Sequence, residues 1–152
     1  MKKSCFFNGN RDASETVEGS LCSCIIDLIE NKGVENFIVG RYGKFDWIAA
    51  KMIIKIKKQY PHIRLTLLTP YHPGCKQISL PDGFDDILYL FEEQAHPKYA
   101  IIQANQKAIC MCEYLVACVN HPGKAQTFLS NACSRENRGL IHTINIGCMK
   151  NA

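Results

Sequence analysis

The residues best suited to chemistry in this sequence follow a short apolar run close to its beginning. The run, Ser4–Phe7, has the length of a buried strand, and Asn8, Gly9, Asn10 and Arg11 come directly after it. Gly9 can adopt a positive φ without steric cost, which predicts that the strand turns here. A turn that leads into a helix N-terminus presents backbone N–H groups to an anion, and the guanidinium of Arg11 suits a phosphate or carboxylate. The stretch therefore predicts an anion site, with an ordinary turn and a surface salt bridge of Arg11 as the alternative.

A helix is predicted after this turn, because apolar residues recur at helical spacing from Val17 to Ile29. Asp12 or Ser14 is placed to cap its N-terminus, and Gly33 is placed to end it. The sequence pattern therefore predicts the helix whose N-terminus would contribute to the anion site.

A second strand, turn and helix repeat this arrangement. Residues 36–40 form an apolar run that ends in glycine, residues 41–45 form the turn, and an apolar helical pattern runs from Ile48 to Ile56. Asp46 stands at or near the start of that helix. Its carboxylate either binds ribose hydroxyl groups or caps the helix, and the two roles are compatible.

The rest of the chain continues to alternate between strands and helices. The predicted elements are a strand over 63–68, a loop over 69–74, an irregular loop over 75–86, a short strand over 86–90, a helix over 96–112, a strand over 114–119, a turn over 120–123, a helix over 124–137 and a strand over 140–146. This alternation predicts one doubly wound α/β domain over residues 1–152, with a mainly parallel sheet of about six strands and helices on both faces. Such sheets bind ligands at the carboxyl ends of their strands, so the turns at 8–11, 40–46, 70–74 and 120–124 are expected along one edge.

Composition excludes several classes of protein. The chain has 152 residues and a net charge of +4, with its only dense basic cluster between Lys51 and Lys58, so nucleic-acid binding is not indicated. The apolar runs are all shorter than the roughly 20 residues that a membrane span needs. Nine cysteines in odd number, without a signal peptide, predict reduced thiols in a cytoplasmic protein.

Two patterns that resemble catalytic or metal sites are set aside. The pairs Cys22-x-Cys24 and Cys110-x-Cys112 lack the C-x-x-C spacing of zinc sites, so packing is the better explanation and no metal or cofactor is expected. Cys118 lies in a predicted strand without an evident group to orient a His121 base, so no nucleophilic role is expected.

The order and distances of the turns resemble one known family. The sequence reads N-G-N-R after the first strand, G-R-Y-G-K-F-D after the second and T-P-Y after the third, with A-I-I-Q-A-N-Q-K-A-I before E-Y-L-V-A-C-V and H-P-G-K-A-Q-T before the last helix. From about Cys5 to Gly147 this pattern resembles the YpsA-like branch of the SLOG superfamily. That superfamily also contains the LOG phosphoribohydrolases and the DprA-type DNA-processing proteins.

The resemblance implies a Rossmann-like fold that binds a nucleotide or a nucleotide-derived ligand. The first turn resembles the family's G-H-R, with Asn10 in place of histidine between Gly9 and Arg11. The second turn resembles G-G-A-x-G-x-D: Gly40, Gly43 and Asp46 match, Arg41 replaces a glycine, and Tyr42 replaces the alanine. These two substitutions either add bulk where a phosphate would otherwise approach the bare backbone, or they supply a guanidinium and a stacking ring to the ligand.

The last turn bears on catalysis. LOG enzymes carry P-G-G-x-G-T-x-x-E, whose glutamate takes part in cleaving the N-glycosidic bond. Pro122, Gly123 and Thr127 match this motif, Lys124 and Gln126 replace its later glycines, and Ser130 stands in place of the glutamate. A serine hydroxyl cannot replace a carboxylate in acid–base chemistry, so no catalytic residue is expected. Lys124 at a helix start adds positive charge where an anion would dock.

The predicted ligand-binding residues come from these turns and from one helix. Asn105 matches a polar position that faces the ligand in the family, or it is a hydrogen-bonded interior amide. The aromatic residues Tyr42, Phe45, Trp47, Tyr71 and His72 either stack on a base or, for Phe45 and Trp47 above all, belong to a core or an interface. The full predicted set is Asn8, Gly9, Asn10, Arg11, Gly40, Arg41, Tyr42, Gly43, Asp46, Pro70, Tyr71, Asn105, His121, Gly123, Lys124 and Thr127.

The sequence therefore predicts non-catalytic binding of a nucleotide-derived small molecule, such as ADP-ribose or a cyclic signalling nucleotide. SLOG domains occur as signal sensors in bacterial defence, so a sensor or a ligand-sequestering protein in the contest between phages and bacteria is expected, and as a homo-oligomer. The alternatives are a phosphoribohydrolase that acts on nucleoside monophosphates with Ser130 or Glu113 in the acid–base role, and a DprA-like nucleic-acid-binding module that uses the lysines between Lys51 and Lys58.

Overall fold

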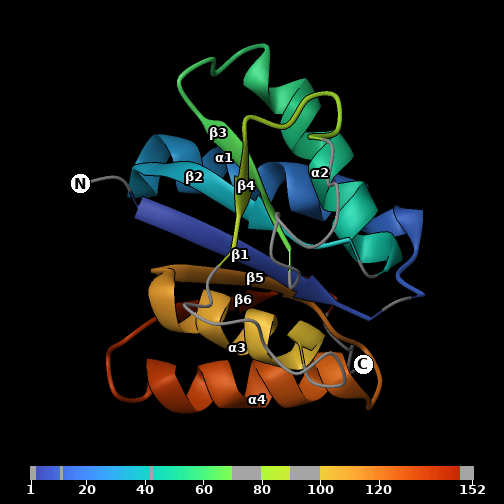
Figure 1. Ribbon diagram of the computed structural model, residues 1–152, viewed down its shortest axis with the longest axis vertical. Helices are drawn as coiled ribbons and strands as arrows, with labels where there is room; N and C mark the ends of the chain where they lie inside the picture. The colour runs from blue at the N-terminus through green and yellow to red at the C-terminus, as the bar shows by residue number, and fades with distance from the viewer. Residues whose placement is uncertain (1–2, 11, 42, 70–79, 90–99, 148–152) are drawn as a thin grey trace.

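A single sheet of six parallel strands forms the centre of the computed structural model, which describes residues 3–10, 12–41, 43–69, 80–89 and 100–147 (Figure 1). The strand order is β4-β3-β2-β1-β5-β6, and every neighbouring pair is parallel. The strands are β1 (Lys3–Gly9), β2 (Val34–Val39), β3 (Arg64–Leu68), β4 (Asp86–Leu88), β5 (Tyr114–Cys118) and β6 (His142–Asn145). The predicted Rossmann-like α/β fold is confirmed.

Four α-helices cover the two faces of the sheet in pairs (Figure 1). α1 (Glu18–Lys32), preceded by the short 3-10 helix η1 (Glu15–Val17), and α2 (Lys44–Lys57) pack on one face; α3 (Ala100–Met111) and α4 (Lys124–Glu136) pack on the other. All four lie where the periodicity predicted them; for α3, the predicted residues 96–99 lie outside the described part of the chain.

The two faces of β1 show why the sequence folds in this way. Cys5 and Phe7 point into the core beneath α1 and α2, whereas Phe6 points into the core beneath α3 and α4, and all three are at most 1% exposed. A run of three apolar residues whose side chains alternate between the two faces can be buried only inside a sheet covered on both sides. β1 accordingly lies between β2 and β5.

The helix ends follow local chemistry. The Ser14 hydroxyl accepts a hydrogen bond from the Thr16 amide at 3.2 Å, which caps η1, and Gly33 ends α1 in the left-handed conformation with φ 73°. Gly43 holds the N-cap position of α2, and Asp46 is the third residue of that helix. Asp46 therefore lies near the helix start as predicted, and its capping and ribose-binding roles stay predictions.

The chain reverses its direction of travel across the sheet beside β1. From β1 it moves outward through β2 and β3 to β4, and it then returns to form β5 on the other side of β1. The boundary between β1 and β5 is therefore the topological switch point of the sheet. The loops that leave β1 and β5 lead to helices on opposite faces, which opens a crevice at the carboxyl ends of the strands. None of the described helices has both the length and the apolar composition needed to cross a bilayer.

Candidate ligand-binding site

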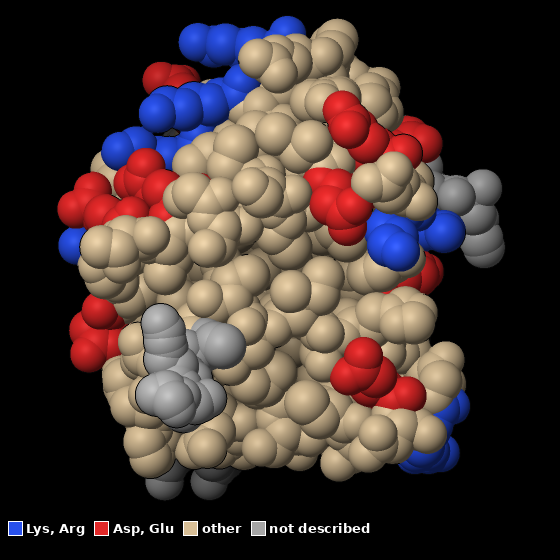
Figure 2. All heavy atoms as spheres, turned by 180° about the vertical axis from the view of Figure 1, so that it is seen from behind, with Lys and Arg blue, Asp and Glu red and all other residues tan. Residues whose placement is uncertain are grey.

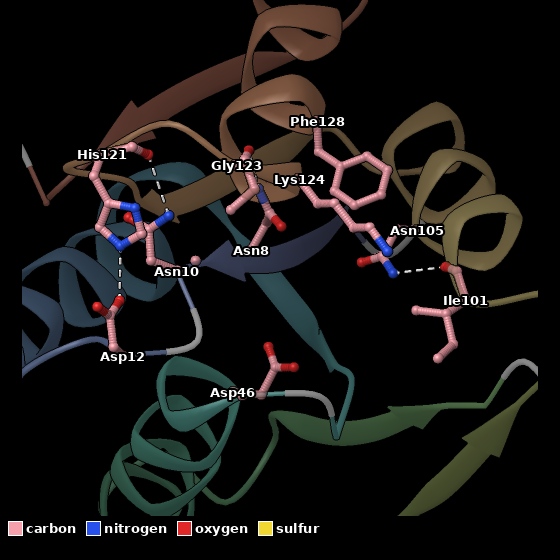
Figure 3. A pocket seen from close by; sticks show the side chains of 13 residues that line it. Asn8, Asn10, Asp12, Asp46, Ile101, Asn105, His121, Gly123, Lys124 and Phe128 are labelled. Carbon is pink, nitrogen blue, oxygen red and sulfur yellow. Dashed lines mark hydrogen bonds and ion pairs between the residues drawn. The ribbon is translucent and has the colours of Figure 1, made fainter.

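A cavity of about 460 Å³ lies at this switch point, between the loop after β1, the start of α2, the middle of α3 and the start of α4 (Figure 3). Ligand pockets for small molecules commonly have volumes of about 300–1,000 Å³. The lining residues are Asn8, Gly9, Asn10, Asp12, Gly43, Asp46, Ile101, Asn105, His121, Gly123, Lys124, Ala125 and Phe128.

Most of the predicted site residues that the structure describes come together here. The exceptions are Gly40, buried at the end of β2, Arg41, exposed in the following turn, and Thr127, exposed on α4 with its hydroxyl donating to the Gly123 carbonyl. The predicted residues Arg11, Tyr42, Pro70 and Tyr71, together with His72, lie outside the described residues, so their roles stay predictions.

Four lining residues were missed by the prediction: Asp12, Ile101, Ala125 and Phe128. Helical spacing could have found two of them. Ile101 stands one turn before Asn105 on α3, and Phe128 stands one turn after Lys124 on α4, so each shares a helix face with a predicted residue. Together with Ala125, these two side chains form the apolar part of the cavity wall.

Two helices begin at the cavity with glycine at the N-cap. Gly43 precedes α2 and Gly123 precedes α4, and neither helix has a side-chain hydrogen bond at its cap. The first intrahelical bonds run from Trp47 N to Gly43 O at 3.4 Å and from Thr127 N to Gly123 O at 3.2 Å. The amide groups of residues 44–46 and 124–126 therefore have no carbonyl partner within their own helix. Both positive dipole ends lie at the cavity, an arrangement that favours an anion.

Gly123 has a backbone conformation reserved for glycine, with φ 152° and ψ −168°. A Cβ built at this position would meet nothing within 4 Å. The glycine is therefore required by the path of the backbone, and it leaves open space at the start of α4.

Gly9 has a different role from the one that the sequence indicated. It is the last residue of β1 and does not have a positive φ. A Cβ at Gly9 would lie 2.5 Å from the Cδ2 atom of Phe45 in α2. The turn prediction was right in place but wrong in cause, because it is the close approach of the Phe45 ring that requires glycine. Phe45 itself is 1% exposed, so it belongs to the core.

Asn8 and Asn10 join β1 to the segment that follows β5. The Asn8 amide donates to Ala125 O at 3.0 Å. The side-chain nitrogen of Asn10 donates to His121 O at 3.3 Å, and its side-chain oxygen accepts from the backbone N–H of Asn120 at 2.8 Å. Both side chains are at most 6% exposed, so these bonds are made away from bulk water. The two asparagines hold the two walls of the cavity at a fixed separation.

Asp12 and His121 form an ion pair that also links the loops after β1 and β5. His121 Nε2 lies 2.8 Å from Asp12 Oδ1, and His121 Nδ1 lies 2.9 Å from Pro122 O (Figure 3). A carbonyl and a carboxylate only accept, so the two contacts are both hydrogen bonds only when the ring is protonated. The bond to Asp12, followed by the bond to Pro122 O, raises the pKa of His121, and the bond to His121 lowers the pKa of Asp12. The rim thus carries a basic ring whose protonated form is paired with the Asp12 carboxylate.

Asp12 is the orienting group for His121 that the sequence did not reveal. It lies 109 positions away in the chain. Cys118 nevertheless fits a packing role, because it is 1% exposed and burial raises the pKa of its thiol. A neutral buried thiol is a poor nucleophile.

The remaining polar groups of the cavity lie on three helices. Lys124, at the first position of α4, extends along the wall toward α3, and the carboxylate of Asp46 points into the cavity from α2 (Figure 3). The Asn105 amide nitrogen donates to Ile101 O at 2.8 Å, which leaves the amide oxygen toward the cavity. Asn105 thus bonds within its helix and also lines the cavity, and its contact with a ligand stays a prediction.

The residues assigned to the hydrolase alternative lie away from the cavity. Ser130 is exposed on α4 and is not among the lining residues. Glu113 precedes β5 at the opposite end of the strands, where its carboxylate accepts from the Ser4 amide at 2.7 Å. Neither side chain is placed to act on a ligand in this cavity.

The cysteines that the structure describes are free thiols, of which Cys5, Cys112 and Cys118 are buried and Cys110 is exposed. No group of three His, Cys, Asp or Glu side chains within the described ranges has the geometry to hold a metal ion.

Comparison with protein families identifies the family of the chain. A model of the YspA SLOG family matches residues 2–79 of the 152 residues, the segment that carries the first two turns of the cavity. Among curated protein sequences, none matches this chain. The order of the turns, the all-parallel sheet and the family match agree, and the chain belongs to the YspA SLOG family.

Proposed function

We propose that the chain binds a nucleotide-derived small ligand in this cavity without hydrolysing it, and so acts as a sensor or a sequestering protein. The observation that carries the proposal is the convergence of two glycine-capped helix N-termini, those of α2 and α4, on one cavity beside Lys124. Phosphate groups suit such amide-lined ends, because the N–H groups and the dipole act together.

The other walls of the cavity suit a ligand that carries a base and a ribose besides its phosphate groups. Ile101 and Phe128 offer an apolar surface for a base, and the Asp46 carboxylate can accept hydrogen bonds from ribose hydroxyl groups. His121, paired with Asp12, adds a second basic group at the rim. ADP-ribose and cyclic signalling nucleotides combine these chemical features, and a ligand of that kind fits the role in bacterial defence expected from the family resemblance.

Isothermal titration against AMP, ADP-ribose and a cyclic dinucleotide tests this proposal. One of them is expected to bind and to be recovered intact. Lys124→Gln should weaken its binding about tenfold or more, since a charge-assisted contact contributes roughly 1.5–3 kcal/mol. Lys32→Gln, the same change at the far end of α1, is the matched control and should bind normally. Failure of all three ligands to bind would overturn the proposal.

One observation favours a second candidate, a phosphoribohydrolase. Asp46 supplies a carboxylate inside the cavity, whereas Ser130 has no carboxylate and does not line the cavity. Incubation with nucleoside monophosphates, followed by chromatography for released base, distinguishes the two functions. Turnover that disappears in Asp46→Asn would establish the enzyme, whereas no released base is expected from a binding protein.

The proposed compartment is the cytoplasm. The free thiols of the described cysteines support a reducing environment, because thiols of this number tend to oxidise outside the cell.

A further inference from the structure

The lysines on the outer side of α2 make their contacts within the chain. On the face opposite to that of Figure 1, Lys and Arg side chains gather over α2, directly above a group of Asp and Glu side chains (Figure 2). Lys44 pairs with Glu15 at 3.6 Å, and the Lys51 ammonium lies 4.5 Å from the centre of the Trp47 ring. Trp47 is 61% exposed and does not line the ligand cavity, so it belongs to neither the core nor the site.

A polar side chain that the proposed function does not use lies at the end of β6. The side-chain oxygen of Asn145 accepts from the backbone N–H of Val119 at 3.0 Å, and its side-chain nitrogen donates to Val119 O at 3.1 Å. The same oxygen accepts from the backbone N–H of Gly147 at 3.1 Å. An asparagine amide carries the same kinds of donor and acceptor as a peptide group. Asn145 therefore continues the pairing of β6 with β5 one residue beyond Cys118, where β5 ends.

Gly147 packs against the same part of the chain. A Cβ built at Gly147 would lie 2.7 Å from the Val119 nitrogen and 2.8 Å from the carbonyl carbon of Cys118. These are backbone atoms, which cannot move aside as the end of a flexible side chain can, so the close approach requires glycine. Residues 145–147 thus hold the end of β5 from the side of β6.

The segment that follows Val119 forms part of the cavity wall. Asn10 holds this segment from the side of β1, through its bonds to the Asn120 N–H and to His121 O. His121 and Gly123 then line the cavity, and Gly123 begins α4. Because Val119 stands only two residues before His121, a displacement at Val119 passes directly into the cavity wall.

We propose that Asn145 is a positioning residue for ligand binding: by fixing both main-chain groups of Val119, it sets the position of His121 and of the start of α4. Its effect on affinity rests on the proposed function, whereas its effect on His121 rests on the fold alone. None of the described residues of β6 lines the cavity, so the strand acts on a ligand through the segment that it holds.

Nuclear magnetic resonance titration of the His121 ring in the ligand-free protein tests the positioning. The bond to Asp12 raises the pKa of His121 in the wild type. Asn145→Ala removes all three bonds of the side chain, so the segment is then held only from the side of β1, and the His121 pKa should fall toward its ordinary value. Asn145→Asp retains the accepting oxygen and loses only the donor to Val119 O. It should cause a smaller fall, and it supplies the measurement if the alanine variant folds poorly.

Thr143→Val is the matched control. Thr143 lies two residues before Asn145 on β6, so both side chains lie on the same face of the sheet. The Thr143 hydroxyl, however, donates to the carboxylate of Glu136, at the end of α4 far from the cavity. Thr143→Val should lower the free energy of unfolding, as Asn145→Ala does, and leave the pKa of His121 unchanged. Urea unfolding of the two variants compares their stabilities.

Isothermal titration with AMP, ADP-ribose and a cyclic dinucleotide tests the effect on binding. A nucleotide that binds the wild type should bind Asn145→Ala about fivefold or more weakly, the order expected from the loss of hydrogen bonds that hold the wall. It should bind Thr143→Val normally. An unchanged His121 pKa in Asn145→Ala, a fall in that pKa without a loss of affinity, or an equal effect of Thr143→Val would overturn the proposal. If the wild type binds none of the three nucleotides, the proposed function fails, and the His121 pKa alone decides whether Asn145 positions the wall.

Discussion

Gly9 and Phe45 pack so closely that no side chain fits between them: a Cβ at position 9 would lie 2.5 Å from the ring. This contact joins the end of β1 to the first turn of α2, and both segments line the ligand cavity. The wall of the cavity on this side is thus set by a steric contact in the core.

Gly9→Ala should therefore destabilise the protein. We expect the free energy of unfolding to fall by about 1–3 kcal/mol, the usual cost of forcing extra volume into a packed site. Gly19→Ala is the matched control, because a Cβ there meets nothing within 4 Å and alanine favours the helix by about 0.5–1 kcal/mol. Urea unfolding followed by circular dichroism measures both changes. Equal stability of the two variants would contradict the proposed contact.

Gly123→Ala should affect both stability and binding. Its backbone, with φ 152°, lies in a region that costs other residues about 1–3 kcal/mol, and relief of that strain would shift the start of α4. Unfolding and ligand titration should both change. Gly139→Ala also places alanine at a positive φ, 73°, but outside the cavity, so it should lower stability and leave ligand affinity intact.

The Asp12–His121 pair should make stability depend on pH in a defined direction. The pKa of His121 is raised in the folded protein, so its contribution is complete below the unfolded value of about 6.5 and is lost as the pH rises through the folded value. The pKa of Asp12 is lowered, so its contribution is present above about 3.9 and is lost as the pH falls through the folded value. The stability difference between wild type and Asp12→Asn should be largest between these limits.

Nuclear magnetic resonance titration of the His121 ring checks this assignment directly. The pKa should lie above the ordinary histidine value in the wild type and fall toward it in Asp12→Asn. An unchanged pKa in that variant would show that the pair does not form in solution. Binding of an anionic ligand should also strengthen as the pH falls through the pKa of His121, because the ring then carries its charge at the rim.

The described cysteines should differ in reactivity. Cys110 is exposed, whereas burial raises the pKa of Cys112 to about 12 and that of Cys24 to about 11. Thiolates are the reactive form, so iodoacetamide should modify Cys110 well before Cys24 and Cys112 in the native protein. Peptide mapping by mass spectrometry measures the order, and addition of urea should remove the difference.

The order and type of the elements could be predicted because the apolar residues of each segment repeat with the period of its structure. β1 has the apolar run Cys5–Phe7 at its centre, and α1 has Leu21, Ile25 and Leu28 at helical spacing. Both were confirmed. Element ends were less accurate, as for the strand predicted over 86–90, which in the structure is Asp86–Leu88.

The site was predictable wherever a turn follows a strand, and it was missed where contact depends on the fold. Asn8, near the end of β1, and Gly43 and Gly123, in the turns after β2 and β5, line the cavity as expected. The Asp12–His121 pair joins residues that are distant in the chain, and no local pattern announces it. The exposure of Trp47 was equally hidden, because a tryptophan within an apolar helix has the pattern of a core residue until the packing is known.

The switch of direction beside β1 means that the two walls of the cavity come from distant parts of the chain. The segment matched by the family model, residues 2–79, supplies the wall built on β1 and α2, and α3 and α4 supply the other. The family model therefore describes one wall of the cavity, and the wall built on α3 and α4 lies outside the matched residues. Family membership thus carries no information about the side chains of that second wall.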